Sequence, residues 1–403
     1  MNQRRRILVL TPRFPYPVVG GDRLRIYEIC RELARHHDLT LLSLCESQEE
    51  MVSISPEDGV FKRIERVHLP KWRSVLNALA ALPRETPLQI AYYQSGAFAS
   101  RVQELLPEHD VCLAHLVRTG HYVRQAKIPT VLEMTDAISM NYKRVRELKK
   151  ARGLKSWVYR FEADRLLRYE RSALEEFNAV TLVSALDRDF LLDGRSGDNV
   201  VVCSNGVDLE ALPFRDRRIS EPVVVFIGNM TSIQNLDACF YFAEEVLPLV
   251  RERLQCRFRV VGRIKPGDAR RLNAIEGVEV LCNVANIADA VGNARVGVAP
   301  VRLGAGVQNK VLEYMALGLP VIASPVALEG LQAREGVDLL VAATPKEYAC
   351  QLETLWYDEA LRAELAASGL RYVAVNHSWV RQLQPLVDSI ACLVDAKLGS
   401  HGA

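Results

Sequence analysis

Short apolar runs alternate with amphipathic stretches along most of the chain, a pattern that is typical of parallel strands joined by crossover helices. In the first half, apolar runs predict strands over residues 7–10, 39–44, 110–115, 129–134, 179–184 and 200–203. In the second half they predict strands over residues 223–227, 258–261, 278–281, 295–300, 320–323 and 339–342. Helical spacing predicts helices over 73–82, 97–106, 237–246, 307–317 and 378–397, and one that Asp22 would cap.

The stretch 296–331 carries the strongest local pattern. A buried strand leads into the turn Gly304–Gly306, a helix follows, and Gly318 and Pro320 end that helix before the next strand. Strand, glycine turn, helix and strand form a βαβ unit, which favours a right-handed crossover in a parallel sheet.

One face of the predicted helix holds chemistry that suits a nucleotide. Gly306, Lys310 and Glu313 lie on the same side of it at about 100° per residue. A glycine turn at a helix N-terminus offers free N–H groups to a diphosphate, and Lys310 would add a full positive charge. The Glu313 carboxylate could accept hydrogen bonds from vicinal hydroxyls such as those of ribose. The alternative is an ordinary amphipathic helix with one Lys/Glu pair.

Candidate residues in the first half follow predicted strands. The first loop ends in Gly20-Gly21 before a helix, where backbone N–H groups could approach a phosphate or a sugar. His115 and Asp136 stand at or just after strand ends, where open α/β sheets place ligands. A plain loop turn and a structural histidine are the alternative interpretations.

Size and composition favour two globular domains. The chain has 403 residues, a net charge of +2 and nine cysteines without a CxxC pair. The small net charge does not indicate nucleic-acid binding, and single cysteines in apolar patterns are typical of reduced core residues. No leader and no apolar run of about 18 residues is found, so we expect a cytoplasmic protein.

Positive charge gathers in one segment. Residues 143–171 hold eleven Lys or Arg against four Asp or Glu, around an apolar stripe that includes Trp157 and Phe161. Such a helix could lie on an anionic membrane surface at the inner face of the plasma membrane, or it could be a solvated helix face. A second, weaker candidate begins at Lys71-Trp72-Arg73 and continues through Leu76, Leu79 and Leu82.

The segment Glu313 to Ile322, EYMALGLPVI, resembles the nucleotide-sugar site of family 4 glycosyltransferases. That family carries a further glutamate eight residues earlier, and here the position is Ala305. The variant RLGAGVQNKVLEYMA is similar to a sub-branch from exopolysaccharide clusters, in which the glycine turn and a lysine replace this glutamate. Gly20-Gly21 and the later NGVD also resemble the family.

The resemblance implies the GT-B fold, with two Rossmann-like domains facing a cleft and a C-terminal helix that returns to the N-terminal domain. It places an acceptor-side domain at 1–214, with 378–403 packed on it, and a donor domain at 215–377. It implies a retaining, metal-independent transferase without a cofactor, which uses a nucleotide-sugar donor (a UDP- or GDP-sugar) and a glycan or lipid-linked acceptor.

The resemblance also extends the candidate site. His115, Asp136 and Lys310 become candidate catalytic residues, and Glu133, Ser139 and Tyr142 match the sub-branch's pattern near Asp136. The donor would be bound by a larger set, namely Gly20, Gly21, Gly228, Asn229, Arg263, Arg302, Gly304, Gly306, Lys310 and Glu313. Relatives often hold the diphosphate with an Arg and a Lys in the loop at 228–230, but this chain has Asn229 and Gln234 or Asn235 there. The cationic role would then pass to Lys310, Arg302 or Arg263.

Two other functions stay open at this stage. A nucleotide-sugar epimerase on the same fold would convert the donor without an acceptor. A catalytically silent GT-B subunit would only bind a partner, and the missing first glutamate favours it. Asp187-Arg188-Asp189 matches a metal-binding D-x-D, but its place at a predicted helix start favours a cap and a solvated face.

Overall fold

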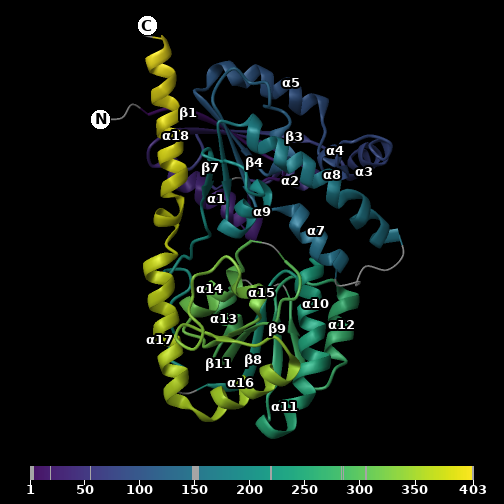
Figure 1. The fold of residues 1–403 in the computed structure, drawn as a ribbon, viewed down its shortest axis with the longest axis vertical. Coiled ribbons are helices and arrows are strands. Elements are labelled where there is room, and N and C mark those ends of the chain that lie inside the picture. The colour runs from purple at the N-terminus through teal and green to yellow at the C-terminus, as the bar shows by residue number, and fades with distance from the viewer. Residues whose placement is uncertain are drawn as a thin grey trace. The chain divides into compact units, whose positions relative to one another are not determined.

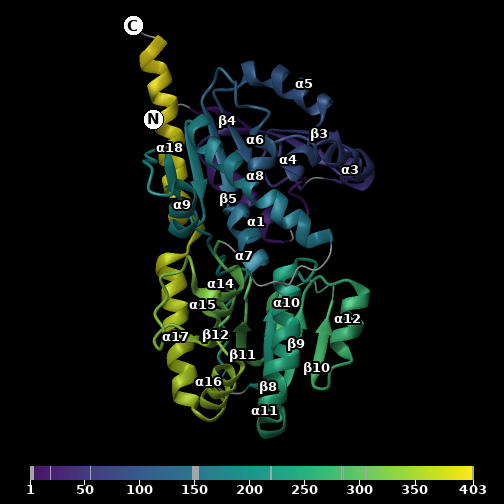
Figure 2. The same ribbon diagram turned by 45° about the vertical axis from the view of Figure 1, so that its right-hand side comes forward.

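The computed structural model describes residues 4–18, 20–54, 56–147, 154–217, 220–282, 284, 286–304 and 306–401. Contacts divide the chain into two compact units. The first comprises residues up to Ser204 together with Leu383 onward, and the second comprises Asn205–Gln382. In Figures 1 and 2 each unit is a parallel sheet flanked by helices.

The first unit contains a seven-stranded sheet in which every pairing is parallel. In sheet order its strands are β3 (Arg63–His68), β2 (Asp38–Cys45), β1 (Arg6–Thr11), β4 (Val111–His115), β5 (Thr130–Thr135), β6 (Ala179–Leu182) and β7 (Val200–Val202). The central strands β1 and β4 are almost wholly apolar and buried, as parallel strands covered on both faces must be. The edge strand β3 was not predicted, because its sequence RIERVH is largely polar and only partly buried.

Helices of the first unit connect these strands. They are α1 (Gly21–Ala34), α2 (Gln48–Val52), α3 (Lys71–Ala80), α4 (Leu88–Tyr92), α5 (Gly96–Leu105), η1 (Leu106–Glu108), α6 (Val117–Gly120), α7 (Ile138–Glu147), α8 (Leu154–Glu176) and α9 (Ala185–Leu192).

The second unit contains a six-stranded parallel sheet. Its strands, in sheet order, are β10 (Val278–Leu281), β9 (Arg257–Val261), β8 (Glu221–Ile227), β11 (Ala294–Ala299), β12 (Val321–Ala323) and β13 (Leu340–Val341). Its helices are α10 (Ile233–Tyr241), η2 (Phe242–Val246), α11 (Leu247–Leu254), α12 (Pro266–Asn273), α13 (Ile287–Val291), α14 (Asn309–Ala316), α15 (Pro325–Leu328), α16 (Pro345–Tyr357) and α17 (Glu359–Asn376).

The C-terminal helix α18 (Trp379–His401) begins in the second unit and continues in the first. Leu386 and Ile390 are buried, and the Cys203 thiol bonds to the backbone of Leu386. The predicted return of the C-terminal helix to the N-terminal domain is therefore confirmed, as are the two Rossmann-like sheets.

The chain passes from one unit to the next at Ser204–Asn205. Asn205 is already tied to the second unit. Its backbone carbonyl lies 2.9 Å from Nδ1 of His377, and its side-chain nitrogen Nδ2 donates to Oδ1 of Asn309 at 2.6 Å.

Candidate functional site

Each sheet has one point at which the strand order reverses, between β1 and β4 in the first unit and between β8 and β11 in the second. Because loops at the carboxyl ends of strands diverge at such a point, ligands of open α/β folds bind there. Most of the candidate donor residues lie in the loops that follow β8 and β11 of the second unit or in α14, which comes after the latter loop. In the first unit, Gly20 and Gly21 lie at the junction of the loop after β1 with α1, and His115 is the last residue of β4.

The loops after β8 and β9 are in backbone contact. The Gly228 N–H donates to the Val261 carbonyl at 3.0 Å, and the Met230 N–H donates to the Arg263 carbonyl at 2.8 Å. Gly262 has φ +135°, and a Cβ there would lie 2.0 Å from the Gly228 carbonyl oxygen. No other residue fits between the two loops, so the sequence places Gly228, Asn229 and Arg263 together.

The side chains of Asn229 and Arg263, both predicted to bind the donor, differ in their polar contacts. Oδ1 of Asn229 accepts from the backbone N–H and the hydroxyl of Thr231, and its own carbonyl accepts from Asn235. The Arg263 side chain is exposed and has no ion pair within the described part of the chain. Asn229 therefore shapes the loop, while the guanidinium of Arg263 is available to an anion.

α14 begins at the predicted glycine turn without a side-chain cap. Gln308 is its N-cap, and the Gln308 side chain accepts no backbone N–H of the first turn, although its carbonyl accepts the Val311 N–H at 3.0 Å. The N–H groups of Asn309 and Lys310 therefore lack a side-chain cap from Gln308. Gly304 and Gly306 both have positive φ, as a tight turn before a helix requires. Ala305, the position of the missing glutamate, lies outside the described residues.

Lys310 is buried in the first turn of α14. Its Nζ donates to Oε1 of Gln308 at 2.9 Å and lies 5.5 Å from the ring centre of Phe226, the penultimate residue of β8. Burial lowers the pKa of Lys310 to about 8, because the loss of hydration outweighs the attraction of Glu313. This lysine therefore still carries its charge in most molecules at pH 7, and in its buried position that charge attracts an anion more strongly than an exposed lysine would.

Glu313 lies one turn further along α14 and is half-buried. Burial raises the pKa of its carboxyl group, and the positive charge of Lys310 opposes that effect. Among the described residues no donor bonds to this carboxylate. A carboxylate that is partly removed from water and receives no hydrogen bond from a described residue is chemically suited to accept hydrogen bonds from the hydroxyl groups of a ligand.

Tyr314, which the sequence analysis did not single out, fixes α14 against the sheet. Its hydroxyl accepts from the Ile227 N–H at 2.8 Å and donates to the Val298 carbonyl at 3.2 Å. Its ring covers Gly297, where a Cβ would lie 2.7 Å from the ring. A glycine inside an otherwise apolar strand was the available signal, since it marks close approach of another group.

We expect Tyr314→Phe to lower the free energy of unfolding by about 1–3 kcal/mol, because it leaves the buried Ile227 N–H without its acceptor. Urea unfolding measures the change. Tyr357→Phe is the matched control, since Tyr357 is 74% exposed and its loss should cost almost nothing. Equal stability of the Tyr314 variant and the wild type would show that Tyr314 is not an anchor.

The Arg302 side chain is bound by two residues of α10 in its own unit. Its Nε and Nη2 each lie 3.1 Å from an oxygen of Asp237 on α10, and its guanidinium stacks 4.0 Å from the ring centre of Tyr241. This bidentate pair engages the charge that a diphosphate would otherwise attract. Of the three predicted cations, Lys310 and Arg263 are the ones whose charge is not paired with a carboxylate by a hydrogen bond in the described structure.

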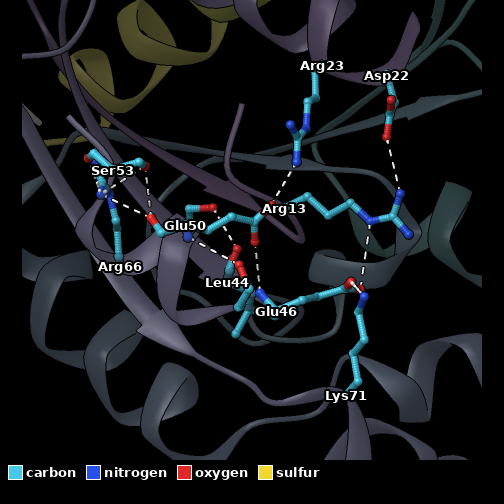
Figure 3. A network of polar contacts seen from close by, with 11 residues as sticks. Arg13, Asp22, Arg23, Leu44, Glu46, Glu50, Ser53, Arg66 and Lys71 are labelled. Atoms are coloured by element: carbon cyan, nitrogen blue, oxygen red, sulfur yellow. Dashed lines mark hydrogen bonds and ion pairs between the residues drawn. The ribbon is translucent and has the colours of Figure 1, made fainter. Parts of the chain in front are cut away.

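Gly20 and Gly21 form the start of α1 in the first unit. Gly20, with φ +100°, is the N-cap and Gly21 is the first helical residue. The prediction that Asp22 caps this helix is wrong. Asp22 lies inside the first turn, and its carboxylate is 3.7 Å from Nη1 of Arg13 (Figure 3).

Arg13 lies at the centre of a polar network beside this helix start (Figure 3). Its Nε is 4.0 Å from Glu46, and Lys71 approaches the same glutamate at 3.7 Å. Glu50, which pairs with Arg23 at 2.8 Å, accepts the Glu46 backbone N–H. The loop after β1 is thus bound to the loop after β2 by charged groups.

His115, at the end of β4, belongs to a buried ionic cluster. Its Nδ1 lies 2.5 Å from Oε2 of Glu133 on β5, and Nε of Arg25 donates to Oε1 of the same carboxylate at 2.7 Å. Burial alone would raise the pKa of Glu133, but Arg25 and His115 outweigh it and lower the pKa to about 2. The ionised carboxylate requires a proton on Nδ1, so Nε2 is the nitrogen left for other chemistry.

Arg25 also reaches the end of the first unit. Its Nη2 donates to the Cys203 carbonyl at 2.8 Å and its Nη1 to the Ser204 carbonyl at 3.3 Å. The sequence analysis predicted a helix after Asp22 but did not identify Arg25 as a buried residue of it.

Asp136 follows β5 and is half-buried. Burial and the nearby Asp187 carboxylate raise the pKa of Asp136 to about 6. Asp187 is fully buried and accepts the Ala137 N–H at 2.9 Å, so the prediction that it lies on a solvated face is wrong. Glu170 accepts the N–H groups of Ile138 and Ser139 and the Ser139 hydroxyl, which completes the cap of α7.

No cluster of three or more His, Cys, Asp or Glu residues within the described ranges is arranged to hold a metal ion. Nor does any helix in the described part of the chain have the length and apolar content needed to cross a bilayer.

Residues 221–358 match the family "Glycosyl transferases group 1". The match runs from β8 through α16 and includes every candidate residue of the second unit, from Gly228 to Glu313. No curated protein sequence matches the chain.

Solved structures of similar fold cover both units. Sucrose-phosphate synthase from Thermosynechococcus elongatus superposes with a TM-score of 0.75 at 16% identity, over 98% of this chain and 100% of the other. Anabaena HepE in complex with UDP and glucose gives 0.67 at 14% identity, over 96% and 100%. A mutant of S. aureus TarM with fondaparinux, alpha-GlcNAc-glycerol and UDP gives 0.67 at 9%, over 97% and 99%. The chain therefore has the GT-B glycosyltransferase fold.

Proposed function

We propose that this protein is a glycosyltransferase that moves a sugar from a UDP- or GDP-sugar to a glycan or lipid-linked acceptor. The observation that carries the proposal is α14, where a helix start without a side-chain cap, a buried Lys310, and a Glu313 to which no described residue donates follow one another along one helix. The helix begins at the point where the strand order reverses, inside the region that matches the glycosyltransferase family. HepE, which shares the fold, was solved with UDP and glucose.

The roles follow from the chemistry of each group. Glu313 would accept the ribose hydroxyls, and the turn at Gly304 and Gly306 would present backbone N–H groups to the diphosphate. Lys310 would neutralise the charge that develops on the leaving diphosphate as the sugar departs, which is electrostatic stabilisation without a covalent intermediate. Gly228, Asn229 and Arg263 border the same end of the sheet, and Arg263 would add a second, exposed cation.

His115 and Asp136 would act on the acceptor side of the reaction. The Glu133 carboxylate fixes the orientation of the His115 ring, so Nε2 is presented in one direction. The raised pKa of Asp136 lets this residue exchange a proton near pH 6. We further propose retention of the anomeric configuration, independence of metal ions, and a role in bacterial exopolysaccharide or surface polysaccharide synthesis.

Attachment to the inner face of the plasma membrane is part of the proposal. The basic segment 143–171 was the first candidate for this contact, but residues 148–153 and the side chains of 147 and 154–160 lie outside the described structure. Lipid-linked acceptors reside at such a surface, which is why membrane attachment fits the proposed reaction.

Thermal-shift titration with UDP-, GDP- and ADP-sugars, with and without EDTA, tests the donor site. A ligand that binds the native state raises its apparent stability in proportion to ln(1 + [L]/Kd), so a selective shift identifies the base. A shift that persists in EDTA supports a metal-free site. The absence of any shift would contradict the donor site and favour a catalytically silent subunit.

Glu313→Ala should weaken binding of the preferred nucleotide by about tenfold to a hundredfold, because charged hydrogen bonds to hydroxyls contribute about 1.5–3 kcal/mol. Calorimetric titration with the nucleoside diphosphate measures the change. Glu364→Ala is the control, because it removes an exposed carboxylate of α17 in the same unit and should leave the affinity within about twofold. Unchanged affinity in the Glu313 variant would overturn the ribose assignment.

A further inference from the structure

Helix α3, at the periphery of the first unit next to α4 (Figures 1 and 2), has its polar and apolar faces reversed. Ser74 is its only buried residue. Trp72 is 65% exposed, and Val75, Leu76 and Leu79 are 49%, 54% and 56% exposed. An amphipathic helix of a soluble domain normally buries such residues.

The exposed apolar residues share one face. At about 100° per residue, Trp72, Val75, Leu76 and Leu79 fall within roughly 100° of one another, and Ser74 lies on the opposite side. Single exposed hydrophobic residues are ordinary on protein surfaces, but four adjacent ones directed away from the core mark an interaction site.

Positive charge borders this face on both sides. Lys71 and Arg73 lie roughly 90° to 110° from the centre of the apolar face, one on each flank. The Lys71 side chain is 72% exposed and 3.7 Å from Glu46, while Arg73 has no ion pair with any residue that the structure describes. Arg84, in the turn beyond the helix, is also exposed, and α3 itself contains no acidic residue.

We propose that α3 is an interfacial anchor that inserts Trp72, Val75, Leu76 and Leu79 into a membrane surface that carries anionic lipids. With the helix axis in the plane of the interface, Lys71 and Arg73 stand at the depth of the headgroups on either side, where each basic residue strengthens the attraction to anionic lipid. Trp72 suits the boundary, because indole combines a large apolar ring with an N–H donor. The anchor would serve the proposed membrane attachment, yet it requires neither the donor site nor an acceptor.

A second copy of the chain fits this face less well than a membrane does. The helix has ten residues and is about 15 Å long, so its apolar face is well below the roughly 800 Å² per partner of a stable interface. Two such faces in contact would also bring Lys71 and Arg73 against the same cations, with no acidic residue on either helix to pair with them.

Co-sedimentation of the full chain with vesicles tests the proposal. We expect binding to phosphatidylcholine mixed with phosphatidylglycerol, much weaker binding to phosphatidylcholine alone, and loss of binding as salt increases. The double variant Leu76→Ser/Leu79→Ser should lower the partition coefficient more than tenfold, since two leucines no longer leave water. Lys71→Gln/Arg73→Gln should lower it by about fivefold for each charge removed.

The matched control is Tyr357→Ser/Val375→Ser, which removes two residues of the second unit that are 74% and 58% exposed. It should bind vesicles like the wild type. Trp72→Phe should retain binding but lose the part of the blue shift in tryptophan emission that accompanies insertion. All variants should melt like the wild type, because the replaced side chains lie largely in water.

Two results would overturn the inference. One is vesicle binding that the Leu76/Leu79 variant leaves unchanged, which would assign the contact to another surface such as 143–171. The other is concentration-dependent dimerisation in sedimentation velocity that the same variant abolishes, which would make α3 a contact between copies. Because no nucleotide is present in these experiments, a failure of the donor site would not affect them.

Discussion

Replacement of Lys310 by methionine should lower kcat by about 10²–10³, while the affinity for the donor falls much less. Lys310 is the buried cation at the start of α14, and its proposed role is to stabilise charge that is larger in the transition state than in the bound donor. Methionine keeps the length of the side chain, so the packing around Phe226 is largely retained. Initial rates at saturating donor, together with calorimetric affinity, separate the two effects.

The pH dependence gives an independent test of the same residue. The pKa of Lys310 in the unliganded protein is lowered to about 8, so the side chain is charged below pH 8 and neutral above it. Since kcat/KM reports ionisation of the free enzyme, it should fall by about tenfold for each pH unit above 8. Lys310→Arg should keep its charge and remove this alkaline decline, because arginine does not lose its proton in this range.

Wild-type turnover in Lys310→Met, or an alkaline decline that persists in Lys310→Arg, would refute the leaving-group role. Arg302→Met is the control that distinguishes a specific role of Lys310 from the loss of any positive charge in the second unit. Arg302 is already paired with Asp237, so its removal should act on the stability of α10 more than on turnover.

Replacement of Arg25 by methionine should destabilise the first unit by about 3–5 kcal/mol. The variant leaves the Glu133 carboxylate buried with one partner fewer, and a buried charge that loses its partner costs more than the pair contributes. Denaturant unfolding, followed by a probe in the first unit, measures the loss. Arg35→Met at the C-cap of the same helix is the control, because the Arg35 side chain is half exposed and its pair with Glu32 contributes about 1 kcal/mol at most.

The acid response of the Arg25 variant should change in a defined direction. In the wild type the Glu133 pKa is lowered to about 2, so the ionised cluster stabilises the protein above the unfolded pKa of about 4.3 and loses that contribution as pH falls toward 2. Without Arg25 this acid dependence should weaken. Adding Glu133→Gln to Arg25→Met should recover part of the stability, and failure to do so would show that Arg25 acts through its bonds to Cys203 and Ser204 instead.

Most strands and helices could be predicted from the sequence, because each leaves a periodic pattern of apolar residues. Apolar runs such as those that became β1 and β4 need burial on both faces, and the helix at 307–317 formed as α14 over Asn309–Ala316. The edge strand β3 escaped notice because an edge strand is not required to be apolar.

The hydrogen-bond and ion-pair partners of the candidate residues could not be predicted from the sequence in the same way. Local spacing indicates which residues share a helix face, but it does not show what a neighbouring element supplies. Arg302 was predicted to bind phosphate, and Asp237 on α10 already holds it. Asp187 was assigned to the surface, but it is buried because the N–H of Ala137, far away in sequence, needs an acceptor.

The periodicity of a helix also does not show whether its apolar face is directed toward the core or toward the surface. The spacing of Trp72, Leu76 and Leu79 predicted a helix with an apolar face, but the same spacing describes a face turned inward and a face turned outward. The structure shows the outward orientation, with Ser74 directed to the protein interior.

The residues on both sides of the Ser204–Asn205 peptide link are held by hydrogen bonds. On one side, Arg25 holds the carbonyls of Cys203 and Ser204 to the ionic cluster of His115 and Glu133. On the other, Asn205 is bonded to His377 and to Asn309, the first residue of α14. The backbone on each side of the Ser204–Asn205 link is therefore held by side chains of its own unit. A substitution that breaks either set of bonds would therefore also disturb residues beside a candidate site, namely His115 and Glu133 in the first unit and the start of α14 in the second.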